Sequence, residues 1–314
     1  MRTYILRRLL WTPVLVLIVT FITFVLGRFG PGDPVEVLMG QYNDPSTAAR
    51  IAAEYHLDRP VIIQYGLYIG NVLSGDFGES YKYKNRKVSD LIKNRIPISA
   101  KLGAAALLLS ISLGVPTGIY AAYKQGTYKD SLAIGLTLLG QSIPVFLTAP
   151  VLLLVLALKI PIFPTHGLEG FFDLGIVLPA LVMGVPGTAI IARLTRASTL
   201  DVLSQDFIRT AHAKGLSGGY IAFFHVFRNA MIPIVTTLGF ALAGLISGSF
   251  IVEAFFGIPG VGLLAVESFF SRDYPVIMAL VMIGTTAFAL ANLVVDLLYP
   301  VIDPRIRIQG GWND

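Results

Sequence analysis

Long runs of apolar residues alternate with shorter polar segments along this chain. A helix needs roughly 20 mostly apolar residues to cross a bilayer. Six stretches meet that requirement, at residues 9–26, 99–123, 131–158, 174–194, 232–252 and 275–299. The pattern predicts an all-α integral membrane protein, a single domain over residues 1–314 with six transmembrane helices and long connections at 28–98 and 195–231.

The first apolar stretch follows a basic start, as the core of a signal peptide does. Its apolar run is longer than such a core, and no small-x-small cleavage site follows it. We therefore expect an uncleaved membrane anchor at this position, and we count it among the six spans.

Composition agrees with a membrane protein, because 54% of the residues are hydrophobic and only 14% are charged. Soluble domains carry about a quarter of charged residues. The chain has no cysteine, which excludes disulfides, thiolate nucleophiles and cysteine-bound metals. The net charge of +5 does not indicate nucleic-acid binding, because basic residues in membrane proteins gather on the cytoplasmic side.

The basic residues that flank the spans predict the orientation. Alternate loops carry most of them: Arg2, Arg7, Arg8, Lys124, Lys129, Arg193, Arg196, Arg209, Lys214, Arg228, Arg305 and Arg307. The short loops on the other side carry only Lys159 and Arg272. The positive-inside rule then places both termini and the 195–231 loop in the cytoplasm, and the 28–98 loop outside.

Few charged residues fall inside the spans, and Asp296 is the clearest of them. Ion-coupled carriers use ionisable groups at mid-membrane, so their scarcity indicates that energy for transport comes from elsewhere. A secondary transporter is the rival hypothesis, and a co-purifying ATPase would exclude it. Small residues four apart, Gly114 with Gly118 and Gly244 with Gly248, suit close helix packing or a substrate passage.

The 195–231 loop is too polar to span and too apolar to be a free linker. We expect Ser204 to cap a helix over 205–214, Gly215 to end it, and Ser217 to cap a second helix over 218–230. Pro233 would then fall in the first turn of the fifth span. Such a hairpin can dock into a cleft of another protein or lie on lipid, and its physical character alone leaves both open.

The stretch RTAHAKG, residues 209–215, resembles the signature loop of ABC-importer permeases, whose pattern is Glu-Ala-Ala, three residues, then Gly. Arg209-Thr210-Ala211 and Gly215 occupy those positions, with Arg and Thr in place of Glu and Ala. The usual downstream Ile-x-Leu-Pro is replaced by a later Met-Ile-Pro. Both departures resemble the dipeptide/oligopeptide/nickel subfamily, whose loop continues with a pattern matched here by His225, Arg228, Asn229, Ala230 and Pro233.

Other segments resemble the same subfamily in the same order. They are PGDP at 31–34, LDRPVIIQYGLYIGNVLSGDFGES at 57–80, FGIPGVG at 256–262 and YPVIDPRIR at 299–307. The resemblance covers nearly the whole chain and is to the first of the two paired permease subunits. It implies a type I ABC-importer fold in a bacterial or archaeal plasma (inner) membrane.

The resemblance also implies the partners. A second homologous permease would complete the pathway, two cytoplasmic ATPases would bind ATP and Mg, and an extracytoplasmic binding protein would deliver substrate. This chain would itself bind no cofactor and no metal and catalyse no reaction. The implied coupling contacts with an ATPase are Asp206, Arg209, Thr210, Ala211, His212, Lys214 and Gly215, supported by His225, Arg228, Asn229 and Pro233.

The long external loop contains signals for two short helices, one capped by Asp44 or Ser46 and one opened by Pro60. The segment YKYKNRK, residues 81–87, is basic and aromatic, but an external solvated loop argues against nucleic acid. We expect the loop to contact the binding protein, with cover of the pathway mouth and packing as alternatives.

Two glycine-rich segments imitate nucleotide sites. GLTLLGQS, residues 135–142, has Gln141 in place of the phosphate-binding lysine, and GIPGVG, residues 257–262, fits a sharp turn better than a dinucleotide site. The four histidines fall outside the spans, which argues against an intramembrane hydrolase.

The sequence leaves the cargo open among peptides, nickel chelates, glutathione and oligosaccharides, with peptides expected. Gln141, Ser142 and Asn292 are the polar residues within the spans that we expect to line the pathway. Hydrogen bonding between helices is the alternative role of these three side chains.

Overall fold

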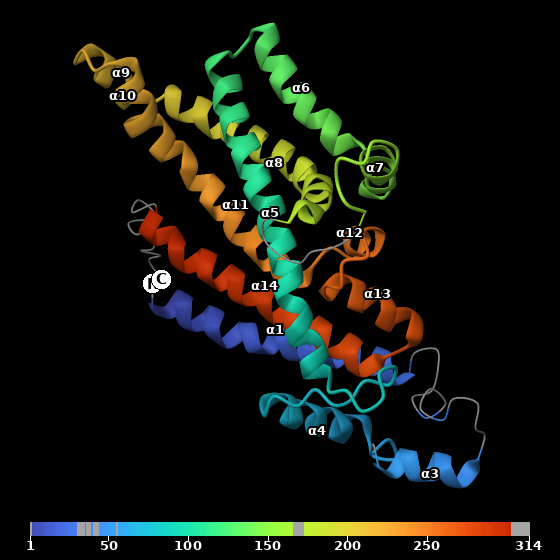
Figure 1. The fold of residues 1–314 in the computed structure, drawn as a ribbon. Coiled ribbons are helices and arrows are strands. Elements are labelled where there is room, and N and C mark those ends of the chain that lie inside the picture. Colours follow the sequence, from blue (N-terminus) through green and yellow to red (C-terminus); the bar gives the residue numbers. More distant parts are fainter. Residues whose placement is uncertain are drawn as a thin grey trace.

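A computed structural model describes residues 2–29, 35, 39, 44–54, 56–165 and 173–302. These residues form helices and no strand, which confirms the all-α prediction. The helices are α1 (Arg2–Phe29), α3 (Pro45–Glu54), α4 (Val61–Leu73), α5 (Val88–Tyr123), α6 (Tyr128–Ser142), α7 (Val145–Leu152), α8 (Val177–Leu203), α9 (Asp206–Ala213), α10 (Gly218–Tyr220), α11 (Arg228–Ser247), α12 (Phe250–Phe255), α13 (Val261–Ser271) and α14 (Tyr274–Ile302) (Figure 1). Two π-helical segments, Leu153–Lys159 and Ile221–Phe227, and a 3₁₀ turn, Leu174–Ile176, join them.

Some sequence predictions fall on residues that the structure does not describe. They concern the PGDP motif at 31–34, His166 and the C-terminal arginines Arg305 and Arg307. The Asp296 side chain, within α14, is also outside the described part. These predictions stay predictions.

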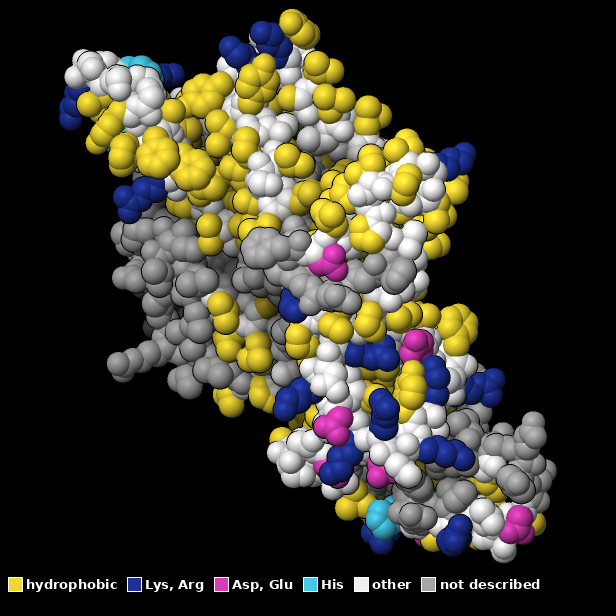
Figure 2. Space-filling view, in the orientation of Figure 1, with side chains coloured by type: hydrophobic (Ala, Val, Ile, Leu, Met, Phe, Trp, Pro, Cys, Tyr) yellow, Lys and Arg dark blue, Asp and Glu magenta, His cyan; other side chains and the backbone are white. Residues whose placement is uncertain are grey.

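Five helices among the described residues are long and apolar enough to cross a membrane, and a sixth span forms if α6 and α7 are counted together. On the face drawn in Figure 2, hydrophobic side chains cover the region of α6, α7 and α11. Charged side chains gather at the end that carries α3 and α4. This separation is typical of a membrane protein with a polar extramembrane end.

The third predicted span, 131–158, is not one helix. The chain bends by 90° between α6 and the helical segment that runs from Val145 to Lys159. Ile143 is extended, with φ −85° and ψ 121°, because the residue before a proline is excluded from the helical region. Pro144 also lacks the N–H that a continuous helix would need.

The second and fifth spans differ from the prediction at their ends. Helix α5 begins at Val88, so the last residues of the predicted 28–98 loop belong to it. The predicted boundary near residue 231 is wrong, because α10, a π-helical segment and α11 run on without a break. Pro233 lies inside α11 and not in a first turn. The helix ends at Ser247, before the predicted 252, because Gly248 has φ +68°.

Helices α5 and α8 pack against each other through glycines. A Cβ atom on Gly114 would lie 2.9 Å from the Ile191 side chain, and one on Gly118 would lie 2.5 Å from the Ala192 carbonyl oxygen. A side chain at either position would therefore force the helices apart. This supports the packing role predicted for Gly114 and Gly118.

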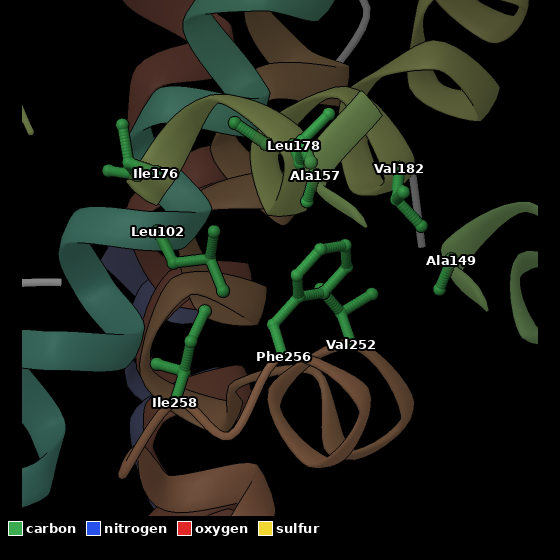
Figure 3. Packing of buried hydrophobic residues seen from close by; sticks show 10 residues of the cluster. Leu102, Ala149, Ala157, Ile176, Leu178, Val182, Val252, Phe256 and Ile258 are labelled. Atoms are coloured by element: carbon green, nitrogen blue, oxygen red, sulfur yellow. The ribbon is translucent and has the colours of Figure 1, made fainter. Parts of the chain in front are cut away.

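A buried apolar cluster holds the broken span against α8 and α12 (Figure 3). Leu102 comes from α5, Leu178 from α8 and Val252 from α12, and each is at most 1% exposed. The Phe256 ring points into the same cluster. Burial of these side chains explains why a span broken at Pro144 keeps a defined position.

A buried carboxylate fixes residues 248–263, which we call the external turn after the side on which the sequence predicts them. Glu253 is fully buried and accepts hydrogen bonds from the Ser99 hydroxyl (2.7 Å), the Ser249 N–H (3.2 Å) and the Leu263 N–H (2.9 Å). The Ser99 hydroxyl oxygen accepts from the Val261 N–H at 2.8 Å. The turn expected at GIPGVG is confirmed, and this network ties it to α5.

Acidic residues near α13 hold the basic segment 81–87. Asp273 is fully buried and accepts from the Ser80 hydroxyl and from the Tyr81 N–H at 3.0 Å. The Tyr83 hydroxyl donates to Glu267 at 2.7 Å, and Lys82 lies 3.7 Å from the same carboxylate. Part of this positive charge is therefore neutralised within the chain.

The first short helix of the loop predicted at 28–98, α3, has the predicted cap. Asp44 accepts hydrogen bonds from the N–H groups of Ser46 (3.3 Å) and Thr47 (3.1 Å), and from both hydroxyls. The side-chain hydrogen bonds of Ser46 and Thr47 lower the pKa of Asp44 to about 2. The second helix, α4, is pinned to α1 by the Tyr65 hydroxyl, which donates to the Leu17 carbonyl at 2.8 Å.

Candidate docking hairpin and pathway residues

Residues 206–227, which we call the cytoplasmic hairpin after the side on which the sequence predicts them, turn at Gly215. Gly215 has φ +77°, and its N–H donates to the His212 carbonyl at 2.9 Å. The Leu216 N–H donates to the Ala211 carbonyl at 3.3 Å. This pair of bonds is a Schellman motif, which satisfies the last carbonyls of α9. The predicted glycine-specified turn is confirmed.

One of the two predicted caps is present. The Ser217 hydroxyl accepts from the Tyr220 N–H at 3.4 Å, as expected at the start of the second helix. Ser204 does not cap α9, because it is still helical at the C-terminus of α8, with φ −79° and ψ −11°. Its hydroxyl donates back to the Asp201 carbonyl at 2.8 Å. Gln205 stands in the extended N-cap position without a capping hydrogen bond, and its side-chain amide donates instead to the Asp201 carbonyl at 3.4 Å.

A small apolar cluster fixes the two limbs of the hairpin together. Ile208 and Ala211 of α9 are buried against Ile221 and Val226 of the next helical segment. Ala211 was expected to contact an ATPase, but at 5% exposed it packs inside the hairpin instead. Ile208 was missed by the sequence analysis, although its spacing of three from Ala211 places both on one helix face.

The outer face of α9 carries the polar residues. Asp206 and Arg209 have side chains that are 94% and 79% exposed and 3.5 Å apart, and Thr210, His212 and Lys214 are also exposed. An exposed ion pair of this kind contributes little to stability. These side chains therefore remain available to a partner.

The second limb presents an aromatic face. Tyr220, Phe223 and Phe224 are 47%, 63% and 54% exposed. The rings of Tyr220 and Phe224 lie 4.7 Å apart between centroids, and those of Phe223 and Phe227 stack at 5.9 Å. This limb opens the apolar stretch Gly218–Gly239, which is long enough to span a membrane. The two limbs thus expose different chemistry.

The supporting residues predicted downstream lie along this second limb and α11. The Asn229 amide donates to the His225 carbonyl at 2.7 Å, which satisfies an acceptor where the π-helical segment passes into α11. The His225 ring lies 5.8 Å from that of Tyr220. Arg228 is exposed.

Two of the three predicted pathway residues lie at the break of the third span. The Gln141 side-chain amide oxygen accepts a hydrogen bond from the Arg193 guanidinium at 3.4 Å, and the Ser142 hydroxyl donates to the Leu138 backbone carbonyl at 2.8 Å. Asn292 is half-buried on another helix, α14.

A cavity of about 460 Å³ lies between α6 and α8. We call it the α6–α8 groove, and it is lined by Asp130, Ser131, Ile134, Gly135, Leu138, Arg193 and Arg196. At the end of the groove where α6 begins, the Arg196 guanidinium makes two hydrogen bonds of 2.7 Å to Asp130. Sequence analysis missed this pair, because its members are 66 residues apart.

In the described ranges, no group of three or more His, Cys, Asp or Glu side chains is placed to hold a metal ion.

Comparison with known proteins decides the family. Residues 114–308 match the family described as binding-protein-dependent transport system inner membrane component, and residues 1–103 match its N-terminal membrane component. The chain belongs to this permease family. Its members are membrane components of transporters and not enzymes, and the resemblance to the dipeptide/oligopeptide ABC permeases is confirmed.

Full-length relatives agree. The chain is 41% identical over 308 residues to the oligopeptide transport system permease protein OppB of Haemophilus influenzae, covering 98% of this chain and 100% of that one. It is 40% identical over 309 residues to OppB of Salmonella typhimurium, with the same coverage. It is 38% identical over 309 residues to the dipeptide transport system permease protein DppB of Bacillus subtilis, covering 98% and 99%.

Solved structures show the same fold. The MetNI methionine ABC transporter in an inward-facing conformation aligns with TM-score 0.51 and 15% identity, covering 68% of this chain and 96% of that one. An amino acid ABC transporter aligns with TM-score 0.50 and 14% identity, covering 68% and 94%. The type I importer permease fold predicted from the sequence is confirmed.

Proposed function

We propose that this permease is one of two membrane-spanning subunits of an ATP-driven importer for di- and oligopeptides. The peptide cargo is supported by the relatives, which are named as oligopeptide and dipeptide transport permeases. The observation that carries the mechanism is the hairpin 206–227, whose α9 exposes charged groups while a buried cluster and Gly215 fix its shape.

The two limbs of the hairpin serve different surroundings. The outer face of α9 carries both signs of charge at Asp206 and Arg209, which suits a polar protein cleft and is unfavourable in hydrocarbon. The aromatic face of Tyr220, Phe223 and Phe224 suits the membrane–water interface. Docking and lipid contact, which the sequence left as alternatives, thus belong to different limbs.

The hairpin transmits motion because helices leave it on both sides. Only Ser204 and Gln205 separate α9 from α8, and the second limb continues into α11. When two ATPase subunits close around ATP and Mg, α9 moves with its ATPase, and α8 and α11 move with it. Together with a second homologous permease, this switches the pathway between inward-facing and outward-facing states.

The remaining assignments follow from the same assembly. Both termini and the hairpin lie in the cytoplasm of a bacterial or archaeal cell, with the chain in its plasma (inner) membrane. The external residues 44–88 receive an extracytoplasmic binding protein that delivers the peptide. No nucleic acid is involved.

Co-purification tests this proposal. The tagged chain, extracted in mild detergent, is expected to recover a homologous permease and ATPase subunits in stoichiometric amounts. A chain recovered alone after several gentle extractions would contradict it.

A matched pair of variants tests the hairpin. Gly215→Val is expected to abolish most peptide transport without loss of membrane insertion, because valine strongly disfavours φ +77°. Gly126→Val is the control, because this turn glycine has φ +76° and nothing within 4 Å, so the change imposes the same backbone strain outside the hairpin and should leave most transport intact. Full activity of Gly215→Val would contradict the role of the turn.

A further inference from the structure

Of the two arginines that line the α6–α8 groove, Arg193 has a side chain that extends along the groove, away from Asp130. Helices α6 and α8 are antiparallel, since Asp130 meets Arg196 near one end and Gly140 meets Val185 near the other. By this register Arg193 lies opposite about residue 133 of α6, roughly 12 Å short of Gln141 along the axis at 1.5 Å per residue. Its guanidinium nevertheless donates to Gln141, so the side chain extends along the groove toward the break after Ser142.

This direction places a cation at depth. Helix α6 starts at Tyr128, beside the basic turn, and Gln141 lies 13 residues further, roughly 20 Å along the axis at 1.5 Å per residue. The hydrocarbon core is about 30 Å thick. Arginines near span ends normally extend toward water, and Arg193 extends the other way. A guanidinium at this depth is costly against lipid, which indicates that the groove faces water or protein.

The charge of the groove is not balanced. Asp130 is occupied by Arg196 through two hydrogen bonds of 2.7 Å. Arg193 forms no ion pair with any residue that the structure describes, and its bond to the neutral Gln141 amide is long, at 3.4 Å. The groove therefore keeps a net positive charge that an anionic group can neutralise.

The surroundings are those of a transport site. The groove has a volume of about 460 Å³, within the range of small-molecule sites. It ends at the 90° break between α6 and α7. Interrupted helices with polar groups near mid-membrane are where many transporters hold their substrates.

We propose that Arg193 recognises the carboxylate of the peptide cargo as it passes, with Gln141 as a second polar contact. A guanidinium can bind a carboxylate through two parallel N–H···O bonds, and every unmodified peptide carries a C-terminal carboxylate. This assignment rests on the proposed function and adds a specificity-determining residue to it. A carboxylate of the second permease is the competing occupant of the groove.

Transport of matched cargoes by the reconstituted complete importer tests the assignment. A peptide and its C-terminal amide are compared in proteoliposomes containing wild type, Arg193→Gln or Arg193→Lys. The binding protein is the same throughout, so its own preference for acid or amide cancels when the transport rate of each variant is divided by that of wild type. Arg193→Gln is expected to slow the free acid about tenfold, as for loss of one charge-assisted contact, and the amide less than twofold. Arg193→Lys keeps the charge but not the two parallel hydrogen bonds, so it should restore only part of the free-acid rate.

The control is Lys159→Gln, which removes an exposed positive charge at the end of the π-helical segment, outside the groove. It should leave the ratio of the two rates unchanged. Equal slowing of acid and amide by Arg193→Gln would overturn the assignment in favour of a contact with the second permease. Failure of the wild-type importer to move either peptide would overturn the proposed function itself.

A labelling measurement covers the case in which Arg193→Gln does not assemble. The chain has no cysteine, so Ile134→Cys puts one thiol into the groove. An anionic thiosulfonate is expected to label it faster than a neutral reagent of equal size, and free-acid peptide should slow labelling during turnover. Equal labelling rates, or no protection by peptide, would contradict a cationic cargo site.

Discussion

The cytoplasmic hairpin and the external turn both reverse the chain at a glycine with positive φ, but they are held in different ways. A Cβ atom on Gly215 would meet nothing within 4 Å. One on Gly248 would lie 2.6 Å from the Glu253 carboxylate. The hairpin is fixed by local hydrogen bonds and leaves its surface open, whereas the external turn is fixed by a buried carboxylate and Ser99 of α5.

This difference agrees with the functions that we propose for the hairpin and for the external turn. A docking element needs an exposed surface of fixed shape that folds without its partner, and local bonds provide that. A turn at the outer end of the pathway must keep its position relative to α5 while the helices move, and long-range bonds provide that. Substitutions should therefore affect the external turn mainly through stability, and the hairpin mainly through transport.

Glu253→Ala should have the largest effect on stability. It leaves the Ser99 hydroxyl and the N–H groups of Ser249 and Leu263 without their buried acceptor, which costs about 4 kcal/mol in free energy of unfolding at 1–3 kcal/mol for each group. Thermal unfolding of the detergent-purified chain measures the loss. Asp206→Ala, at a 94% exposed carboxylate, is the control and should change little. Equal unfolding temperatures for the two variants would contradict a stabilising role of Glu253 in the external turn.

Alanine substitutions at Gly248 and Gly215 compare the external turn and the hairpin most directly. Gly248 has φ +68° and ψ 178°, a region open essentially to glycine alone, so Gly248→Ala should cost about 3 kcal/mol. Gly215→Ala should cost about 1 kcal/mol, because the left-handed region is only mildly unfavourable for alanine. Thermal unfolding gives the order of stability and peptide uptake gives the function. A less stable Gly215→Ala than Gly248→Ala would reverse the comparison.

Ser99→Ala removes the α5 side chain from the same hydrogen-bond network. The Val261 N–H loses its acceptor and Glu253 loses one of its three donors, so we expect a cost of about 2 kcal/mol. Ser112→Ala, on the same helix but exposed, is the matched control. Equal unfolding temperatures for Ser99→Ala and Ser112→Ala would contradict a stabilising role of the Ser99 hydroxyl.

Ser217→Ala should have the smallest effect. The hydroxyl accepts the Tyr220 N–H at a long 3.4 Å, so loss of this cap is expected to cost about 0.5 kcal/mol. Amide hydrogen exchange should speed up in residues 218–221 and remain unchanged in the external turn. Faster exchange in both regions would show that the hairpin is not self-contained.

Local signals explain which features could be read from the sequence. Gly215, Ser217 and Asp44 each act on residues within a few positions, and the predicted turn and the two predicted caps are confirmed. The lengths of the apolar runs predicted the spans but not the break at Pro144, because a run length says nothing of a bend within it. The Ile143–Pro144 pair in the sequence was the signal for that bend. Ser204 was mispredicted because α8 continues to Leu203, further than polarity indicated.

Long-range contacts explain the rest. The Ser99–Glu253 bond joins residues 154 positions apart, and the Ser80–Asp273 bond joins residues 193 positions apart. No spacing rule connects such positions in a single sequence. The docking role that we propose for α9 rests on a resemblance, and the burial of Ala211 depends on the second limb of the hairpin, which the sequence alone did not place against α9.

Photo-cross-linking at Thr210 and Phe223 in membranes that contain all the importer subunits is the most direct test of the central claim. A benzophenone side chain at exposed Thr210, on the α9 limb, is expected to form an adduct with an ATPase subunit. The same group at Phe223, on the aromatic limb, is expected to react with lipid. Adducts between Thr210 and lipid alone, with none to an ATPase, would contradict the assignment of α9 as the docking element.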